Sequence, residues 1–265
     1  MKNKVRVLDV GGALLDSYQL ENYLQKLAAD QILKSNSDRN TYPIPRVKEN
    51  LEFISDVYNF LNEDLKNKIP IHPAGEWILD NFYIVEKNAK MIIKDLSVKK
   101  YINLIGISNG SNKGFARVYV LAKEIISYTD SKINGEDLEK YLHAYQNKKA
   151  LSMEELWSIN TFLQIALIEK IRIICEKIYL SQMQKRKVEN IISRLVEFNE
   201  KPEFKAPGVY KLKIEESVES KYPFIEYMSY RLKKYGKKAY SYLEILEDQV
   251  NKMGSNTLEC INREH

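Results

Sequence analysis

Two carboxylates and an indole stand close together in the segment from Ile71 to Glu86, IHPAGEWILDNFYIVE. Glu76 and Asp80 are four residues apart, so a helix places both carboxylates on one face, next to Trp77. These carboxylates and the amide of Asn81 suit the hydroxyl groups of a sugar, and an indole suits the apolar face of a pyranose ring. The spacing therefore predicts a carbohydrate-binding surface on this helix.

The same residues also have a structural explanation. Acidic groups in the first turn stabilise a helix through its positive end, and a tryptophan is commonly buried. Arg117 and Tyr119 lie in a second dense segment, FARVYVLA. We expect Arg117 to be buried as the ion-pair partner of one of three acids, Glu76, Asp80 or Glu124. The sequence therefore allows two interpretations of these residues, a structural ion-pair cluster or a glucan-binding cluster. In the second interpretation, Tyr119 is the second aromatic side chain that would contact a glucan.

The chain offers no residues that we expect to be catalytic. The carboxylates of a glycosidase flank the bound sugar, whereas Glu76 and Asp80 line one helix surface. The glycine-containing segment 107–114, ISNGSNKG, is predicted to be a flexible loop and lacks the preceding strand that a phosphate-binding loop needs. No cofactor is expected. No metal site is expected either, because the histidines and cysteines lack the spacing of metal ligands: His72, His143, His265, Cys175 and Cys260. His72, before Pro73, is better explained as a capping or packing residue.

Composition predicts a folded helical protein. The 265 residues are 44% hydrophobic and 29% charged, and only 10 Gly and 7 Pro argue against an all-β fold. The net charge of +5 is small for a protein dedicated to nucleic-acid binding. The 2 cysteines fit a reducing compartment. No apolar run reaches the length of about 18 residues that a membrane-spanning helix needs.

Apolar residues recur at steps of three and four along most of the chain, which predicts helices. A capping box, Ser152 and Glu155, opens the longest apolar pattern, which we predict to be a central core helix that contains Trp157 and continues to about 198. The only strand-like alternation lies at 5–10. The predicted fold is all-α, with antiparallel helical hairpins around a long central helix. A solenoid of helix pairs is the alternative arrangement, although the sequence contains no exact repeat that would establish it. The other predicted helices span 18–35, 46–67, 73–96, 115–128, 136–147, 223–236 and 238–253.

The positions of proline and glycine residues predict that the chain is divided into consecutive segments. We expect an N-terminal helix and loop at 1–45, a core helical domain at 46–199, a linker at 200–208 and a C-terminal helical segment at 209–265. A turn at 254–257 would open a further helix at Thr257. We therefore expect the last segment to be truncated from a longer chain.

Three segments carry a resemblance to a known family, in the same order as in that family. They are HPAGEWILDNF, the stretch 116–146 and the stretch 151–172. Together they resemble the N-terminal region of the cyclic β-1,2-glucan synthases, large membrane glycosyltransferases with a phosphorylase-like C-terminal part. The resemblance is good over about 45–180, and the segment after Asp95 departs from it.

The resemblance implies a non-catalytic helical domain that scaffolds a UDP-glucose-dependent glycosyltransferase or handles growing glucan. Its partners would be the other domains of the parent synthase and β-glucan, with no nucleic acid, and it would reach the membrane only through the parent. The implied location is the cytoplasmic side of the inner membrane. The alternative is a free-standing helical adaptor that binds protein or nucleic acid. The basic segments 182–187 and 231–238 suit contact with RNA or with anionic lipid headgroups, and they equally suit solvated helix faces.

Overall fold

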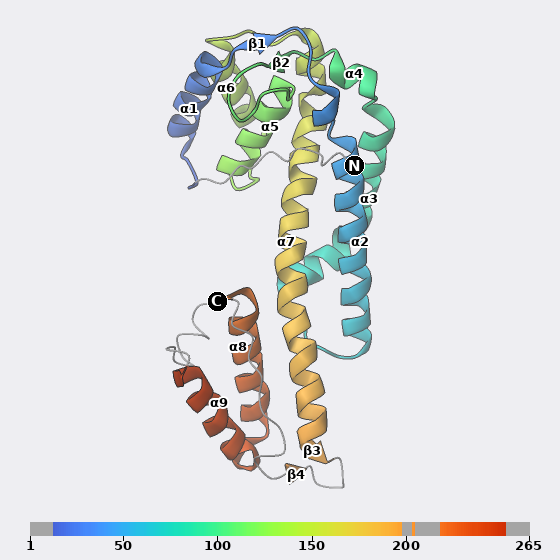
Figure 1. Ribbon diagram of the computed structural model, residues 1–265, viewed down its shortest axis with the longest axis vertical. Coiled ribbons are helices and arrows are strands. Elements are labelled where there is room, and N and C mark those ends of the chain that lie inside the picture. Colours follow the sequence, from blue (N-terminus) through green and yellow to red (C-terminus); the bar gives the residue numbers. More distant parts are fainter. Residues whose placement is uncertain (1–12, 198–202, 205–217, 253–265) are drawn as a thin grey trace. The chain divides into compact units, whose positions relative to one another are not determined.

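The computed structural model of the chain describes residues 13–197, 203–204 and 218–252 (Figure 1). This described part is all-α, as the sequence predicts, and α7 runs unbroken through 43 residues. Its nine α-helices are α1 Ser17–Asp30, α2 Ile44–Lys66, α3 Pro73–Asp95, α4 Val98–Ile102, α5 Arg117–Tyr128, α6 Gly135–Gln146, α7 Met153–Leu195, α8 Val218–Lys234 and α9 Tyr240–Lys252.

Short pieces of other structure connect the helices. Two strands of two residues, β1 (Leu33–Lys34) and β2 (Gly106–Ile107), pair antiparallel, with Leu33 opposite Ile107. Strands β3 (Val196–Glu197) and β4 (Glu203–Phe204) form a second antiparallel pair. Two 3-10 helices complete the set, η1 Arg39–Thr41 and η2 Gly236–Ala239.

Two helix boundaries differ from those predicted from the sequence. The first helix was expected to reach 35, but α1 ends at Asp30. The chain is extended at Gln31, and the amide of Ile32 donates to the side chain of Asn109, a distant residue that the local sequence pattern cannot reveal. Helix α8 begins at Val218, so Pro223 lies inside the helix and not at its first position.

Other sequence expectations at the helix ends are confirmed or lie outside the described residues. Helix α8 stops at Lys234, and Gly236 follows it with a φ of 61°, the left-handed conformation that glycine adopts at low cost. The capping box at Ser152 is present. The predicted strand at 5–10, the turn at 254–257 and the helix from Thr257 fall outside the described residues.

Contacts within the chain define two compact units, each built from two stretches of sequence. Unit 1 comprises Met1–Asp56 and Asn81–Ile173, and unit 2 comprises Val57–Asp80 and Ile174–His265. Helices α2, α3 and α7 therefore contribute residues to both units. The linear division at 45, 199 and 208 remains a prediction.

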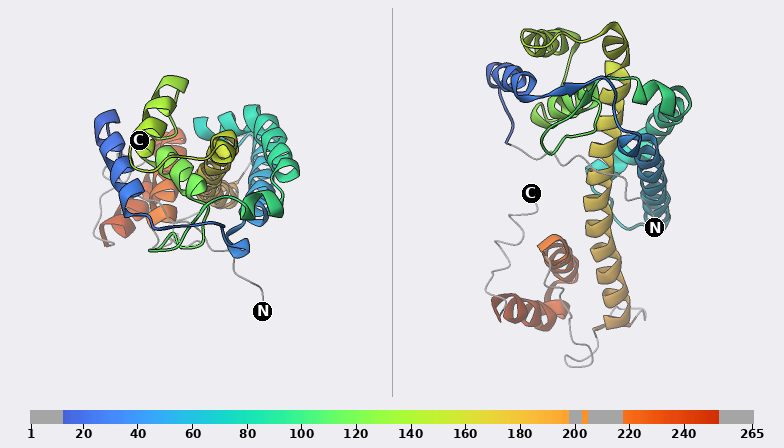
Figure 2. Two further views of the ribbon diagram at one scale, coloured as in Figure 1. Left: turned by 90° about the horizontal axis from the view of Figure 1, so that it is seen from above. Right: turned by 45° about the horizontal axis from the view of Figure 1, so that its top comes forward.

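Helix α5 is the buried helix of unit 1. Every residue from Arg117 to Ile126 is buried. The ring of Tyr119 stacks on Phe162 of α7, with ring centroids 5.5 Å apart, and Tyr23 of α1 donates a hydrogen bond of 2.9 Å to Glu124. Helix α1 also packs along α6, and the two views of Figure 2 show them side by side. Unit 1 thus encloses α5, which explains why this short helix carries so many apolar residues.

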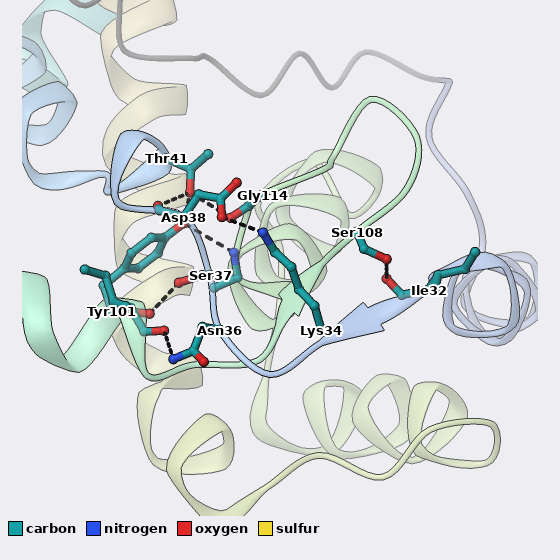
Figure 3. A network of polar contacts seen from close by, with 11 residues as sticks. Ile32, Lys34, Asn36, Ser37, Asp38, Thr41, Tyr101, Ser108 and Gly114 are labelled. Atoms are coloured by element: carbon teal, nitrogen blue, oxygen red, sulfur yellow. Dashed lines mark hydrogen bonds and ion pairs between the residues drawn. The ribbon is translucent and has the colours of Figure 1, made fainter.

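The segment 107–114, expected to be a flexible loop, is held by hydrogen bonds to residues 32–41 (Figure 3). Ser108 donates from both its amide and its hydroxyl group to the carbonyl oxygen of Ile32. At the other end, the carbonyl oxygen of Gly114 accepts from the amide of Asp38 at 2.7 Å and from the hydroxyl group of Thr41 at 2.9 Å. The buried Tyr101 contacts Thr41 in turn, and burial raises the pKa of Tyr101 to about 12.

Unit 2 has its own apolar core, formed where α8 and α9 meet the second half of α7. One edge of this core is polar and partly buried: Glu189 of α7 accepts hydrogen bonds from Tyr227 at 2.5 Å and from Arg231 at 2.8 Å. The buried core residues are Val188, Ile192, Leu195, Phe224, Ile225, Tyr227, Met228, Leu232, Ala239, Tyr242, Leu246 and Val250.

The close approach of β2 to the chain after β1 gives a test of unit 1. A Cβ atom on Gly106 would overlap the carbonyl oxygen of Asn36, a backbone atom that cannot move aside alone. We expect Gly106→Ala to lower the free energy of unfolding by about 1–3 kcal/mol, the usual cost of overpacking. Gly135→Ala is the matched control, because a Cβ atom there meets nothing within 4 Å. Denaturant unfolding of the two variants checks this, and equal midpoints would contradict the close approach.

Candidate functional site

The side chains of Arg117 and Glu155 form a buried ion pair at the start of α5 and α7. The Nε atom of Arg117 donates to Oε1 of Glu155 and its Nη2 atom donates to Oε2, both at 2.7 Å. The two side chains are only 2% and 0% exposed. This bidentate geometry, with two parallel hydrogen bonds, gives the strongest interaction between a guanidinium and a carboxylate.

Each partner of this pair also holds the backbone. Glu155 Oε2 accepts from the amide of Ser152 at 2.8 Å, while the Ser152 hydroxyl oxygen accepts from the amide of Glu155. The Arg117 Nη2 atom donates to the carbonyl oxygen of Ala150 at 2.7 Å, and the Arg117 amide donates to Ile105. The pair thus fixes the start of α5, the chain before α7 and the first turn of α7 at one point.

The Arg117 guanidinium stays charged in this setting. Burial lowers the pKa of Arg117, but the hydrogen bonds and charge of Glu155 raise it, and the net effect is a raised pKa. A buried charge is tolerated only when it is paired and its donors are satisfied. Both conditions hold here, because the carboxylate and the Ala150 carbonyl oxygen accept from the guanidinium.

Arg117 is buried with an acid, as the sequence predicts, but the acid is Glu155 and not one of the three expected partners. Glu124 accepts instead from Tyr23, and burial raises the pKa of Glu124. Glu76 and Asp80 are exposed residues of unit 2, whereas Arg117 belongs to unit 1. Glu155 serves both the capping box and Arg117, because a carboxylate has enough lone pairs to cap a helix and bind a guanidinium together.

Tyr119 is part of a second buried cluster and is not a surface residue. Its side chain is 3% exposed, and its hydroxyl group donates to Glu169 at 2.7 Å. Glu169 also forms an ion pair of 3.0 Å with Lys123. The expectation that Tyr119 contacts a glucan is wrong, because its side chain is buried and its ring stacks on Phe162 inside unit 1.

The four predicted residues on α3 are mostly exposed. Glu76 and Asp80 are exposed, Asn81 is half-buried, and Trp77 is 50% exposed. Trp77 is therefore not the buried tryptophan of the structural explanation. Glucan binding by this group remains a prediction.

The start of α3 confirms the structural role expected for His72. Its Nδ1 atom accepts a hydrogen bond of 3.1 Å from the amide of Ala74. Its carbonyl oxygen accepts from the amides of Gly75 and Glu76. His72 therefore caps α3.

A cleft beside Trp157 is the site that the sequence analysis missed. Trp157 was expected to lie in the core, but its side chain is 75% exposed. It borders a cleft of about 380 Å³ between the end of α3, the α4 region and the first turns of α7. The lining residues are Asp95, Leu96, Lys100, Asn103, Leu104, Glu154, Trp157, Ser158 and Thr161.

The buried ion pair explains why Trp157 faces outward. Glu155 and Trp157 are two residues apart, which is about 200° around an α-helix, so burying one exposes the other. Glu154, Trp157 and Thr161 follow at steps of three and four and share a face. The sequence carries this signal, since the polar residues on this face contrast with the buried Ile159, Phe162, Leu163 and Ala166.

Two further properties concern the described residues alone. Among them, no group of three or more His, Cys, Asp or Glu side chains is placed to hold a metal ion. No helix in this part of the chain is both long enough and apolar enough to span a membrane.

Comparison with known proteins gives one clear relationship. No protein-family model matches the chain. Over 217 residues, however, it is 26% identical to the cyclic β-(1,2)-glucan synthase NdvB of Rhizobium meliloti (strain 1021). This chain is related to a segment of that synthase. The match covers 82% of this chain but only 8% of the synthase, so the activity of the whole synthase does not transfer with it. The resemblance to the cyclic β-1,2-glucan synthases is thereby confirmed.

The buried pair makes a prediction about stability. Removing Arg117 leaves Glu155 as a buried carboxylate without its main partner, so Arg117→Ala should cost about 3–5 kcal/mol of unfolding free energy. Lys90→Ala is the control, because it breaks the exposed Lys90–Glu86 pair, 2.7 Å long, and should cost less than about 1 kcal/mol. Urea unfolding followed by circular dichroism measures both. Similar small losses for the two variants would mean that Arg117 does not hold unit 1 together.

Proposed function

We propose that this chain is a non-catalytic helical part of a cyclic β-1,2-glucan synthase-like glycosyltransferase, where it scaffolds the enzyme or handles growing glucan. The observation that carries the proposal is the relationship to NdvB over 82% of the chain. The proposal extends that relationship from sequence to role.

The use of charged groups in unit 1 supports a scaffolding role. Arg117, Glu155, Lys123 and Glu169 are all buried and are engaged with one another across α5 and α7. Groups committed to such pairs hold helices in place and are not free to move protons to or from a substrate. The exposed acids Glu76 and Asp80 lie on α3 alone, which does not resemble two carboxylates placed on opposite sides of a sugar.

The partners in this proposal are the other parts of the synthase and β-glucan. The chain would reach the cytoplasmic side of the inner membrane through the parent protein. The alternative of a nucleic-acid-binding adaptor is less well supported, because the basic segments are partly neutralised. Arg186 pairs with Asp64 and Glu63, and Arg231 pairs with Glu189.

The first test is catalytic. We expect the purified chain neither to hydrolyse UDP-glucose nor to cleave β-glucans, because the buried acids Glu155 and Glu169 are paired with Arg117 and Lys123, and the exposed acids Glu76 and Asp80 lie on one helix. Product analysis over many hours, with heat-treated protein as the blank, measures this. Steady turnover that disappears in Glu76→Gln would contradict the proposal.

The second test is genetic. If the chain is a part of a synthase, its gene should continue in frame beyond His265 into a glycosyltransferase sequence. Sequencing the downstream region decides this. A stop codon directly after His265 would favour the free-standing adaptor instead.

A further inference from the structure

We propose that the cleft beside Trp157 binds a short segment of neutral glucan, with the Trp157 indole stacked on a pyranose ring. The choice of glucan as the sugar rests on the proposed function. The site itself rests on the shape, lining and charge of the cleft in unit 1, and it is separate from the acids and indole of α3 that the sequence pointed to.

The shape of the cleft suits a small ligand. Its volume of about 380 Å³ lies within the range of roughly 300–1,000 Å³ that is usual for ligand pockets. Leu96 and Leu104, each 5% exposed, give it an apolar base. Trp157 forms an aromatic wall that is 75% exposed and therefore has a free face. An indole above an apolar base offers the flat contact that the C–H face of a pyranose ring needs.

The polar groups around the indole suit hydroxyl groups. The carboxylates of Asp95 and Glu154 accept hydrogen bonds, the amide of Asn103 both donates and accepts, and Thr161 adds a hydroxyl group. Ser158 already donates to the carbonyl oxygen of Glu155 at 2.9 Å, which leaves its oxygen as an acceptor. Such a mixed set of donors and acceptors matches a sugar, whose every hydroxyl group both donates and accepts.

The charge of the cleft favours a neutral ligand over an anionic one. The lining includes two residues with carboxylates, Asp95 and Glu154, and one with an ammonium group, Lys100. The Lys100 Nζ atom also donates to the backbone carbonyl oxygen of Asp95 at 2.9 Å, which keeps it at the wall of the cleft. Phosphate groups bind where positive charge is in excess, and here negative charge is in excess. The cleft is therefore suited to a glucan chain and not to a nucleotide sugar.

The walls are fixed before any ligand arrives. Glu155 holds the first turn of α7 through Arg117 and Ser152, so Glu154 and Trp157 keep their outward direction. On the other side, the Tyr42 hydroxyl group donates to the carbonyl oxygen of Leu96 at 2.5 Å, and Ser97 caps α4. A preformed site loses little conformational freedom on binding, which raises its affinity. The cleft is open and partly solvated, so we expect a dissociation constant of about 1 mM.

Isothermal titration calorimetry of the full chain with a linear β-1,2-glucan oligosaccharide tests the proposal. We expect Trp157→Ala to weaken binding at least about tenfold, the effect of losing one good aromatic contact. Tyr18→Ala is the matched control, because Tyr18 is an aromatic residue of α1 that is also 75% exposed and lies outside both candidate binding groups, and it should leave binding unchanged. Because Trp157 is exposed, its variant should keep the unfolding midpoint of the parent chain, which circular dichroism verifies. In the Trp77→Phe background, Trp157 is the remaining indole and its fluorescence should change on adding the oligosaccharide.

Three outcomes would overturn the glucan site. The first is the absence of both heat and a fluorescence change at oligosaccharide concentrations up to several tens of millimolar, on the order of ten times or more the expected dissociation constant. The second is loss of binding in Trp77→Phe but not in Trp157→Ala. The third is tighter binding of UDP-glucose than of the oligosaccharide. None of them touches the proposed scaffolding role, which the absence of turnover and the downstream gene sequence test separately.

Discussion

The buried ion pair between Arg117 and Glu155 is the constraint on which unit 1 depends. Two full charges are removed from water there, which is costly unless every donor and acceptor is satisfied. The surroundings meet that condition only in one arrangement, with Ala150 accepting from the guanidinium and Ser152 donating to the carboxylate. The start of α5, the α6–α7 connection and the first turn of α7 must therefore come together in one way.

This constraint reaches the surface through the geometry of a helix. Once Glu155 points inward, Glu154 and Trp157 must point outward, beside the end of α3 and the α4 region. A second buried cluster, Tyr119 with Glu169, fixes α5 against α7 about four turns further along α7. The buried ion pair that holds the helices together therefore also sets the position of the candidate glucan site. This fits a helical segment that is related to a glucan synthase and in which the buried charged groups of the segment itself serve structure.

The sequence predicted the helices well because their apolar spacing is a local property. It predicted the capping box at Ser152 and the helix stop at Gly236 for the same reason. It could not predict the partner of Arg117, because Glu155 is 38 residues away and several acids were equally plausible. Trp157 was assigned to the core because its helix is strongly apolar. The polar face that it shares with Glu154 and Thr161 was the sequence signal that it faces solvent, and the burial of Glu155 fixes that direction. The β1–β2 pair was missed because its strands are two residues long and depend on distant contacts.

The most direct test of this account is a double-mutant cycle between Arg117 and Glu155. It requires the unfolding free energies of the parent chain, of Arg117→Met, of Glu155→Gln and of the double variant. The account predicts that the double variant is much less damaged than the sum of the two single variants, with a coupling energy of about 2–3 kcal/mol, since each single variant leaves a buried charge alone. A coupling energy near zero would contradict it and would mean that the two side chains act independently.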